Sequence, residues 1–337
     1  MKLRHFNIPI FIPELACPFQ CIYCDQQKIT GNRTLPTEEE ILEIVEQHLR
    51  TFPEIAREVQ IAFFGGTFTA LAPAAQKRYL ELVQPYLEQQ KVGGIRISTR
   101  PDYIDKANLQ MLKELGVTHI ELGAQSLVDS VLRESRRGHS VADVERAAKM
   151  ISAQGFVLGL QMMIGLPGDS AEYALQTAQK IVELGAAETR IYPTVVIRGT
   201  ALERLWRKGA YQPLDTEEAI EQAADLLVFF ENHKVKVLRV GLYPSEDLTD
   251  KQEAVAGPDL PHFKEKVLSS IWRKILEAAI DFEHTEKALR ISVAPAEYNF
   301  AVGFGASNRK WLEQHFRKVK FVMKKELKGR AYEVVYY

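Results

Sequence analysis

The feature that most constrains the fold is a repeated alternation of short apolar runs with amphipathic helical patterns, which continues to about residue 240. Runs of this length, rich in β-branched residues, are typical of buried strands. The expected strands are residues 8–12, 59–64, 95–99, 119–122, 157–164, 189–196 and 235–240. The expected helices are residues 37–50, 73–88, 106–115, 141–154, 172–184 and 216–232. About six strand–helix units in succession predict an α/β fold, a partial (βα)6 TIM-like barrel over residues 1–241.

The pattern changes after Gly241. Residues 242–261 are polar and rich in proline, glycine and aspartate, which is typical of a connecting segment. Residues 262–337 then show a helical pattern (262–280), a strand pattern (288–293), a second helical pattern (307–316) and two paired strands around 319–323 and 332–336. We therefore predict a small C-terminal α+β subdomain over residues 262–337.

Charge and cysteine usage narrow the class of protein. The 337 residues contain 43 Lys and Arg against 44 Asp and Glu, so the net charge of −1 gives no reason to expect that the molecule as a whole binds a polyanion such as DNA. No apolar stretch approaches the length of a membrane span, and Pro9 interrupts the only apolar run near the N-terminus. The three cysteines form no disulfide framework. We predict a cytoplasmic protein with no membrane partner.

All three cysteines lie in one octapeptide, CPFQCIYC, as Cys17, Cys21 and Cys24. This segment directly follows the first expected strand, at the edge of the barrel where such folds hold their active sites. Three thiolates on one loop can hold three irons of a 4Fe–4S cluster and leave the fourth iron open to a small molecule. Two alternatives remain at this point: a zinc site completed by a distant histidine such as His5, and a thiol–disulfide pair of Cys21 and Cys24.

The CxxxCxΦC spacing, in which Tyr23 is the aromatic residue Φ, resembles the signature of the radical SAM superfamily. The resemblance implies a 4Fe–4S cluster ligated by Cys17, Cys21 and Cys24, with S-adenosylmethionine (SAM) bound to the open iron. Reduction by a flavodoxin- or ferredoxin-type electron donor would cleave SAM to methionine and a 5′-deoxyadenosyl radical, which abstracts a substrate hydrogen.

Further segments are similar to the family's SAM-binding elements at the ends of successive strands. The resemblance assigns the methionyl group of SAM to a glycine-rich turn, its ribose and carboxylate to the end of the fourth strand, and its adenine to the end of the fifth. The implied cofactor-binding residues are Tyr23, Gly65, Gly66, Thr67, Arg100, Glu121, Gln125, Ile164 and Gly165. For Arg100 and Glu121 a structural ion pair is the alternative. His139, in the segment RRGH, would contact substrate.

Seven ordered segments, from CPFQCIYCDQQ to IYPTVVIRGTALERLWRKGAY, are similar to the catalytic subunit of Elongator. That subunit spaces its first two cysteines more widely and carries a long acetyltransferase-like domain, whereas only residues 241–337 follow the matching region here. The resemblance therefore implies a short Elongator-like branch without that domain, with tRNA modification as one function. The alternative is a coproporphyrinogen-oxidase-like enzyme acting on a tetrapyrrole or another small molecule, although that branch has a fourth cysteine in its motif.

The C-terminal segment carries the only local charge excess. Between residues 309 and 330 stand nine Lys and Arg against Glu313 and Glu326, interleaved with Trp311, Phe316 and Phe321. Cations with interleaved aromatic side chains would suit the backbone and bases of RNA, which makes tRNA a candidate partner. Two readings compete with this one: a solvated basic surface, and a non-enzymatic module that binds zinc and RNA.

Overall fold

A computed structural model describes residues 4–12, 17, 20–25, 28, 35–53, 57–242 and 253–337. These residues divide into two compact units, each described separately below. The first comprises Met1–Asp215 and Phe229–Pro258, and the second comprises Thr216–Val228 and Asp259–Tyr337.

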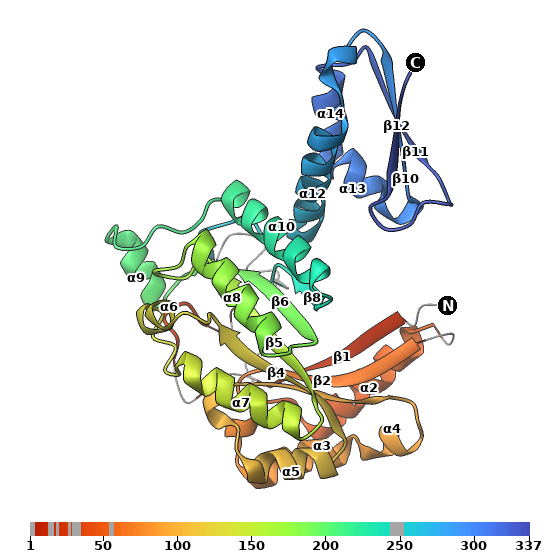
Figure 1. Cartoon of the computed structure of the whole chain (residues 1–337). Helices are drawn as coiled ribbons and strands as arrows, with labels where there is room; N and C mark the ends of the chain where they lie inside the picture. Colours follow the sequence, from red (N-terminus) through yellow and green to blue (C-terminus); the bar gives the residue numbers. More distant parts are fainter. Residues whose placement is uncertain are drawn as a thin grey trace. The chain divides into compact units, whose positions relative to one another are not determined.

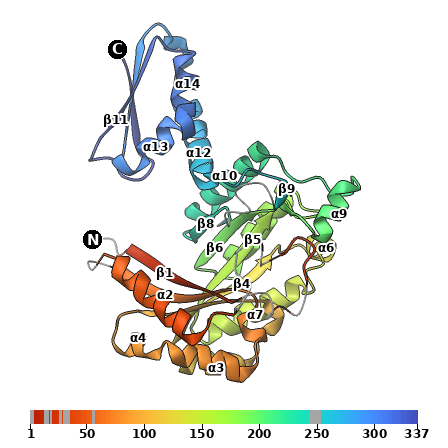
Figure 2. The ribbon, with the colours of Figure 1, turned by 180° about the vertical axis from the view of Figure 1, so that it is seen from behind.

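The first unit is built on a seven-stranded sheet in which every neighbouring pair of strands is parallel. The strand order is β1-β2-β3-β4-β5-β6-β8. The strands are β1 (Arg4–Ile12), β2 (Arg57–Gly65), β3 (Gly94–Thr99), β4 (Val117–Gln125), β5 (Val157–Ile164), β6 (Glu188–Pro193) and β8 (Lys236–Val240). The sheet curls into a half-barrel (Figures 1 and 2), which confirms the expected partial TIM-like barrel; the strand expected at residues 235–240 is its last strand, β8.

Helices cover the outer face of this sheet, as the crossover connections of a parallel sheet require (Figure 1). They are α2 (Glu38–Thr51), α3 (Pro73–Leu82), α4 (Gln84–Glu88), α5 (Lys106–Glu114), α7 (Val141–Ala153) and α8 (Ala171–Glu183). Thr37 and Glu40 form the capping box that their spacing predicts at the start of α2. The sequence pattern did not reveal the shorter helices α6 (Asp129–Glu134) and α9 (Ala201–Arg207).

The second unit contains α12 (Phe263–Ala279), α13 (Tyr298–Val302), α14 (Ser307–Glu313) and a three-stranded sheet. The first part of α10 (Thr216–Asn232) belongs to this unit. In the sheet, β10 (Ala288–Val293) lies between β11 (Lys318–Met323) and β12 (Tyr332–Tyr336), so the last two strands do not pair with each other as expected. β10 occupies the central position because its side chains Leu289, Ile291 and Val293 are fully buried in the core of the unit.

A two-stranded antiparallel ribbon, β7 (Val196–Ile197) with β9 (Ala254–Ala256), completes the sheets. In the described part of the chain, no helix is long and apolar enough to cross a membrane.

Candidate active site

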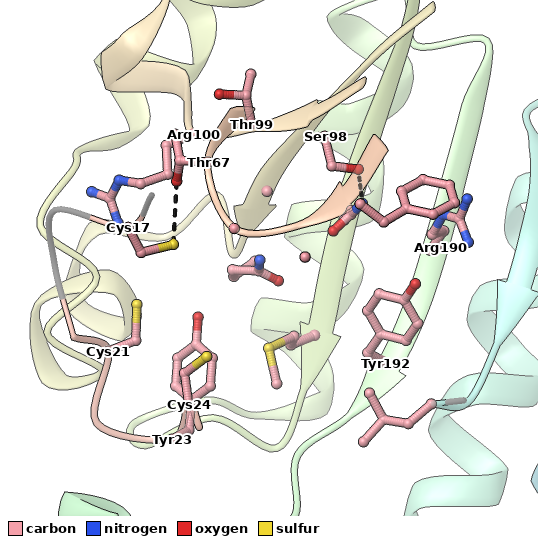
Figure 3. A pocket seen from close by; sticks show the side chains of 18 of the residues that line it. Cys17, Cys21, Tyr23, Cys24, Thr67, Ser98, Thr99, Arg100, Arg190 and Tyr192 are labelled. Carbon is pink, nitrogen blue, oxygen red and sulfur yellow. Dashed lines mark hydrogen bonds between the residues drawn. The ribbon is translucent and has the colours of Figure 1, made fainter. Parts of the chain in front are cut away.

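A cavity of about 1050 Å³ opens at the carboxyl ends of the barrel strands (Figure 3). Ligand pockets for one small molecule usually measure about 300–1,000 Å³, so this cavity is large enough for a ligand of cofactor size. Nine of the thirteen residues that the sequence assigned to the site line it: Cys17, Cys21, Tyr23, Cys24, Gly65, Gly66, Thr67, Arg100 and Gln125.

The cysteine segment is held against the barrel by backbone bonds and by packing. The amide of Ile22 donates to the carbonyl of Ser135 at 3.4 Å, and its own carbonyl accepts from the amide of Leu202 at 2.8 Å. Ile22 and Tyr23 are buried in a cluster with Val131 and Leu202, next to Cys21. Because the turn around Cys21 is anchored from two sides, its sulfur is fixed at the cavity wall.

The three sulfur atoms face the same space (Figure 3), and none of the three cysteines forms a disulfide. Among the described residues, no three Cys, His, Asp or Glu side chains converge closely enough to hold a single metal ion. Each thiolate of a 4Fe–4S cluster binds a different iron, so three separated sulfurs around one cavity suit a cluster. The donor set is therefore compatible with such a group.

Thr67 and Gly65 shape the wall beside Cys17. The Thr67 hydroxyl lies 3.4 Å from the Cys17 sulfur (Figure 3), within hydrogen-bond reach of a thiol. Gly65 has φ +107°, and a Cβ there would lie 2.3 Å from the Ile12 carbonyl oxygen. The glycine is thus required by the close approach of β1 and β2, and this approach brings the turn to the cavity edge.

Two residues on β4 reach the cavity floor. Gln125 is a non-glycine residue at φ +65°, and its buried Oε1 has no hydrogen-bond partner among the described residues. An unsatisfied amide oxygen in a left-handed backbone position is typical of a binding site. At Gly123 an added Cβ would lie 2.8 Å from Arg137 Nη2, so only glycine leaves room for that guanidinium.

Arg137 was not assigned to the site from the sequence, yet its buried guanidinium lines the cavity. Nη1 donates to the Cys21 sulfur at 3.1 Å, Nη2 to the Gly123 carbonyl at 2.8 Å, and Nε to His139 Nε2 at 3.1 Å. The RRGH segment was the only available signal, and it pointed to His139 instead.

His139 lies behind Arg137 and does not line the cavity. Burial, followed by the charges of Arg137 and Arg100, lowers the pKa of His139 to about 4. The neutral ring accepts from Arg137 and so orients it toward Cys21; this assignment of the ring nitrogens follows from the hydrogen-bond network.

Glu121 lies on β4 before Gly123 and Gln125 and is buried, outside the lining of the cavity. Its carboxylate accepts from Arg96 at 2.8 Å and from Arg190 at 2.6 and 2.9 Å. Burial favours the neutral form, but the two arginines outweigh burial and lower the pKa of Glu121 to about 2. Glu121 is thus part of a structural ion network, but its partners are Arg96 and Arg190 and not Arg100, which pairs with Asp102.

Ile164 and Gly165, at the end of β5, also lie outside the cavity lining. Strand alternation turns Gln161 and Met163 toward the cavity and the buried Ile164 away from it. The Gly165 amide donates to Asp169 at 2.9 Å, and its carbonyl accepts from the Tyr211 hydroxyl at 2.6 Å. The backbone amide and the backbone carbonyl of Gly165 are therefore both hydrogen-bonded within the protein.

In the C-terminal unit, the aromatic side chains expected to stack on bases are mostly used for packing. Phe316 and Phe321 are buried in the core of the unit, and Trp311 packs partly buried against that core beneath the Arg273 guanidinium, 3.9 Å from its ring. The interleaving with lysines arises because the apolar side of each element faces that core.

A half-barrel whose carboxyl edge combines three cysteines, a glycine turn and a ligand-sized cavity defines an α/β-barrel enzyme with a metal-cluster cofactor. The Radical SAM superfamily model matches residues 12–181, and the Radical_SAM C-terminal domain model matches residues 187–273. The chain therefore belongs to the radical SAM superfamily. Members of this superfamily are enzymes that use a 4Fe–4S cluster to cleave SAM reductively, and they need an electron donor.

Several known proteins are similar to this chain. An uncharacterized protein of Methanocaldococcus jannaschii is 33% identical over 223 residues, 65% of either chain. The tRNA uridine(34) acetyltransferase of Dehalococcoides mccartyi is 28% identical over 239 residues, covering 61% of this chain and 52% of that protein. Human Elongator complex protein 3 is 32% identical over 182 residues, covering 52% and 33%. The chain thus spans between a third and two thirds of the length of these relatives.

Among solved structures, the archaeal Methanocaldococcus infernus Elp3 with an N-terminal deletion superposes with a TM-score of 0.63 at 22% identity. The match covers 86% of this chain and 71% of that chain. The likeness extends the shared fold beyond the half-barrel strands.

Proposed function

We propose that Cys17, Cys21 and Cys24 are the protein ligands of the cluster and that the cavity beside them binds SAM and substrate. The cluster, when bound, supplies the electron that cleaves SAM to methionine and a 5′-deoxyadenosyl radical. Support comes from the three sulfurs, which face one cavity (Figure 3). The described lining of that cavity contains no aspartate or glutamate.

The other cavity residues hold SAM and exclude water. Gly65, Gly66 and Thr67 form the turn against the methionyl end, and the Gln125 amide oxygen takes a donor from the ligand. Arg100, fixed by a two-bond ion pair with Asp102 at 2.9 Å for each bond, supplies positive charge for the SAM carboxylate. Tyr23 lines the cavity beside the cysteines. Burial raises the pKa of its phenol, so the side chain stays neutral.

As substrate we propose a nucleoside of tRNA. The observation that carries this proposal is the similarity, at 28 to 33% identity, to relatives named tRNA uridine(34) acetyltransferase and Elongator complex protein 3. The chain spans only part of the length of those proteins. We also place the protein in the cytoplasm, where its thiols stay reduced, and propose a flavodoxin or ferredoxin as the electron donor.

A basic face in the C-terminal unit supports an RNA substrate. Arg290 on β10 pairs directly with Lys320 on β11, and Lys318 lies two residues away on the same face. All three side chains are exposed, while the alternate residues Leu289, Ile291 and Phe321 face the core. Three cations on one side of a small sheet complement the negative charge of an RNA backbone.

The proposal is tested first with the reconstituted enzyme. Anaerobic protein with SAM and dithionite should form 5′-deoxyadenosine, and Cys21→Ala should form none. Added tRNA from a deletion strain should gain a modified nucleoside that tRNA from the parent strain already contains. Formation of 5′-deoxyadenosine without any change in tRNA would contradict the RNA substrate and leave the enzyme class intact.

The basic face is tested by a triple variant of the full chain, Arg290→Gln, Lys318→Gln, Lys320→Gln. A control carries Lys149→Gln, Lys208→Gln and Lys264→Gln, three exposed lysines outside that face. The first variant should lower the slope of log K against log salt for tRNA by about 2 to 3, since each lost phosphate contact removes nearly one counterion. Equal slopes for both variants would exclude this face as an RNA contact.

A further inference from the structure

The described lining of the cavity contains four arginines and no aspartate or glutamate: Arg100, Arg137, Arg190 and Arg239. Such a lining offers guanidinium groups and no carboxylate to a bound ligand. Two of these arginines lie on the cysteine side. Arg137 donates to the Cys21 sulfur, and Arg100 lies beside Cys17 (Figure 3).

The other two arginines lie on neighbouring strands across the cavity. The register of β6 and β8 pairs Arg190 directly with Arg239, so both side chains leave the sheet on the same face. Tyr192, two residues beyond Arg190, lines the same part of the cavity, with its hydroxyl toward Arg190 (Figure 3). Both guanidiniums therefore line the same part of the cavity.

Arg190 is held rigidly for binding. Glu121 takes two of its N–H groups from behind, and its guanidinium lies 4.9 Å from the centre of the Phe64 ring. The Glu121 carboxylate also binds Arg96, and Arg96 pairs in turn with Glu188, which accepts from Lys236; two carboxylates therefore offset three cations in this network. A fixed, partly compensated guanidinium pays little entropy when it binds a planar or tetrahedral anion.

We propose that Arg190, Arg239 and Tyr192 form a substrate subsite that binds an anionic group, a carboxylate or a phosphate, of the molecule that reacts with the radical. The subsite lies across the cavity from the cysteines, so an anchored anion leaves the rest of the substrate between it and SAM. The inference rests on the proposed position of SAM beside the cysteines, and it applies equally to a nucleotide phosphate and to a small acid.

The test is calorimetric binding to the full-length protein at constant ionic strength, with two matched pairs of probes. Uridine 5′-monophosphate is compared with uridine, and malonate with malonamide. At least one anion should bind ten or more times as tightly as its neutral partner; the pair that shows the preference tells phosphate from carboxylate. Arg239→Gln should abolish the preference, and Arg239→Lys should retain part of it.

Two controls separate this subsite from other cations. Arg207→Gln alters an exposed arginine on α9 away from the cavity, and the triple variant of the basic face removes the cations of the C-terminal unit. Both should retain the preference. Equal binding of anion and neutral probe, or a preference that survives Arg239→Gln, would overturn the proposal. Formation of 5′-deoxyadenosine, measured in parallel, reports on the cofactor site alone. Failure of the proposed cofactor site and failure of the proposed anion subsite are therefore distinguishable.

Discussion

Arg137 Nη1 lies 3.1 Å from the Cys21 sulfur, although the two residues are 116 positions apart in the chain. The same guanidinium is fixed by the Gly123 carbonyl and by His139, so it cannot turn away from the thiol. A permanent positive charge therefore lies against one of the three proposed cluster ligands. Hydrogen bonds and charges at cluster sulfurs are among the main determinants of reduction potential.

Replacing Arg137 by glutamine should make the cluster harder to reduce, because a nearby cation stabilises the more negative reduced state. A loss of ~1.4 kcal/mol corresponds to a potential lower by roughly 60 mV for one electron. Arg137→Lys should shift the potential less. The measurement is a redox titration of the reconstituted protein followed by electron paramagnetic resonance. Arg133→Gln, an exposed arginine on α6, is the control, and a potential shared by it and Arg137→Gln would refute the assigned role.

Glu121→Gln should destabilise the fold and leave SAM binding nearly unchanged. The substitution removes the carboxylate that Arg96 and Arg190 share in the barrel interior, and breaking a buried pair in this way costs about 3–5 kcal/mol. Denaturant unfolding measures the loss; Glu114→Gln, on the exposed side of α5, should change stability by about 0.5 kcal/mol or less. A tenfold loss of SAM affinity in the folded variant would instead make Glu121 a cofactor ligand.

Gly65→Ala should cost about 3 kcal/mol or more, because it combines a positive φ with a backbone clash at the Ile12 carbonyl. Gly185→Ala is the matched control: Gly185 has φ +73°, but nothing lies within 4 Å of an added Cβ. The conformational strain alone should cost it about 1–2 kcal/mol. Thermal unfolding of the two variants compares these losses. Equal losses would show that the Ile12 carbonyl on β1 moves aside without loss of stability.

The stability of the protein should fall as pH decreases from 6.5 to 4, in part because of His119. Burial, followed by the charge of Arg96, lowers the pKa of His119 from its ordinary value of 6.5 to about 4. Between these pH values the unfolded chain binds a proton that the folded chain does not, so acid favours unfolding. The contribution amounts to at most about 3 kcal/mol. His119→Gln should flatten the pH dependence of the unfolding free energy in this window; an unchanged slope would show that other groups cause it.

The order of strands and helices and the place of the cysteines follow from local sequence. Residue periodicity identifies the seven strands of the sheet, and the capping pattern at Thr37 marks the start of α2 within a residue. Short-range rules suffice here because hydrophobic spacing and turn residues act on neighbouring positions. The cysteine spacing likewise identified the family.

Which side chains reach the cavity was decided only by the tertiary structure. Glu121 and Gln125 both lie on β4. Glu121 belongs to a buried ion network, whereas Gln125, further along the strand, lines the cavity. Arg190 meets Glu121 across 69 positions, and its pairing with Arg239 depends on the register of two strands. Depth along a strand and register between strands are properties of the assembled sheet. Local sequence therefore identified the chemistry of the site, while the folded sheet determined which residues surround it.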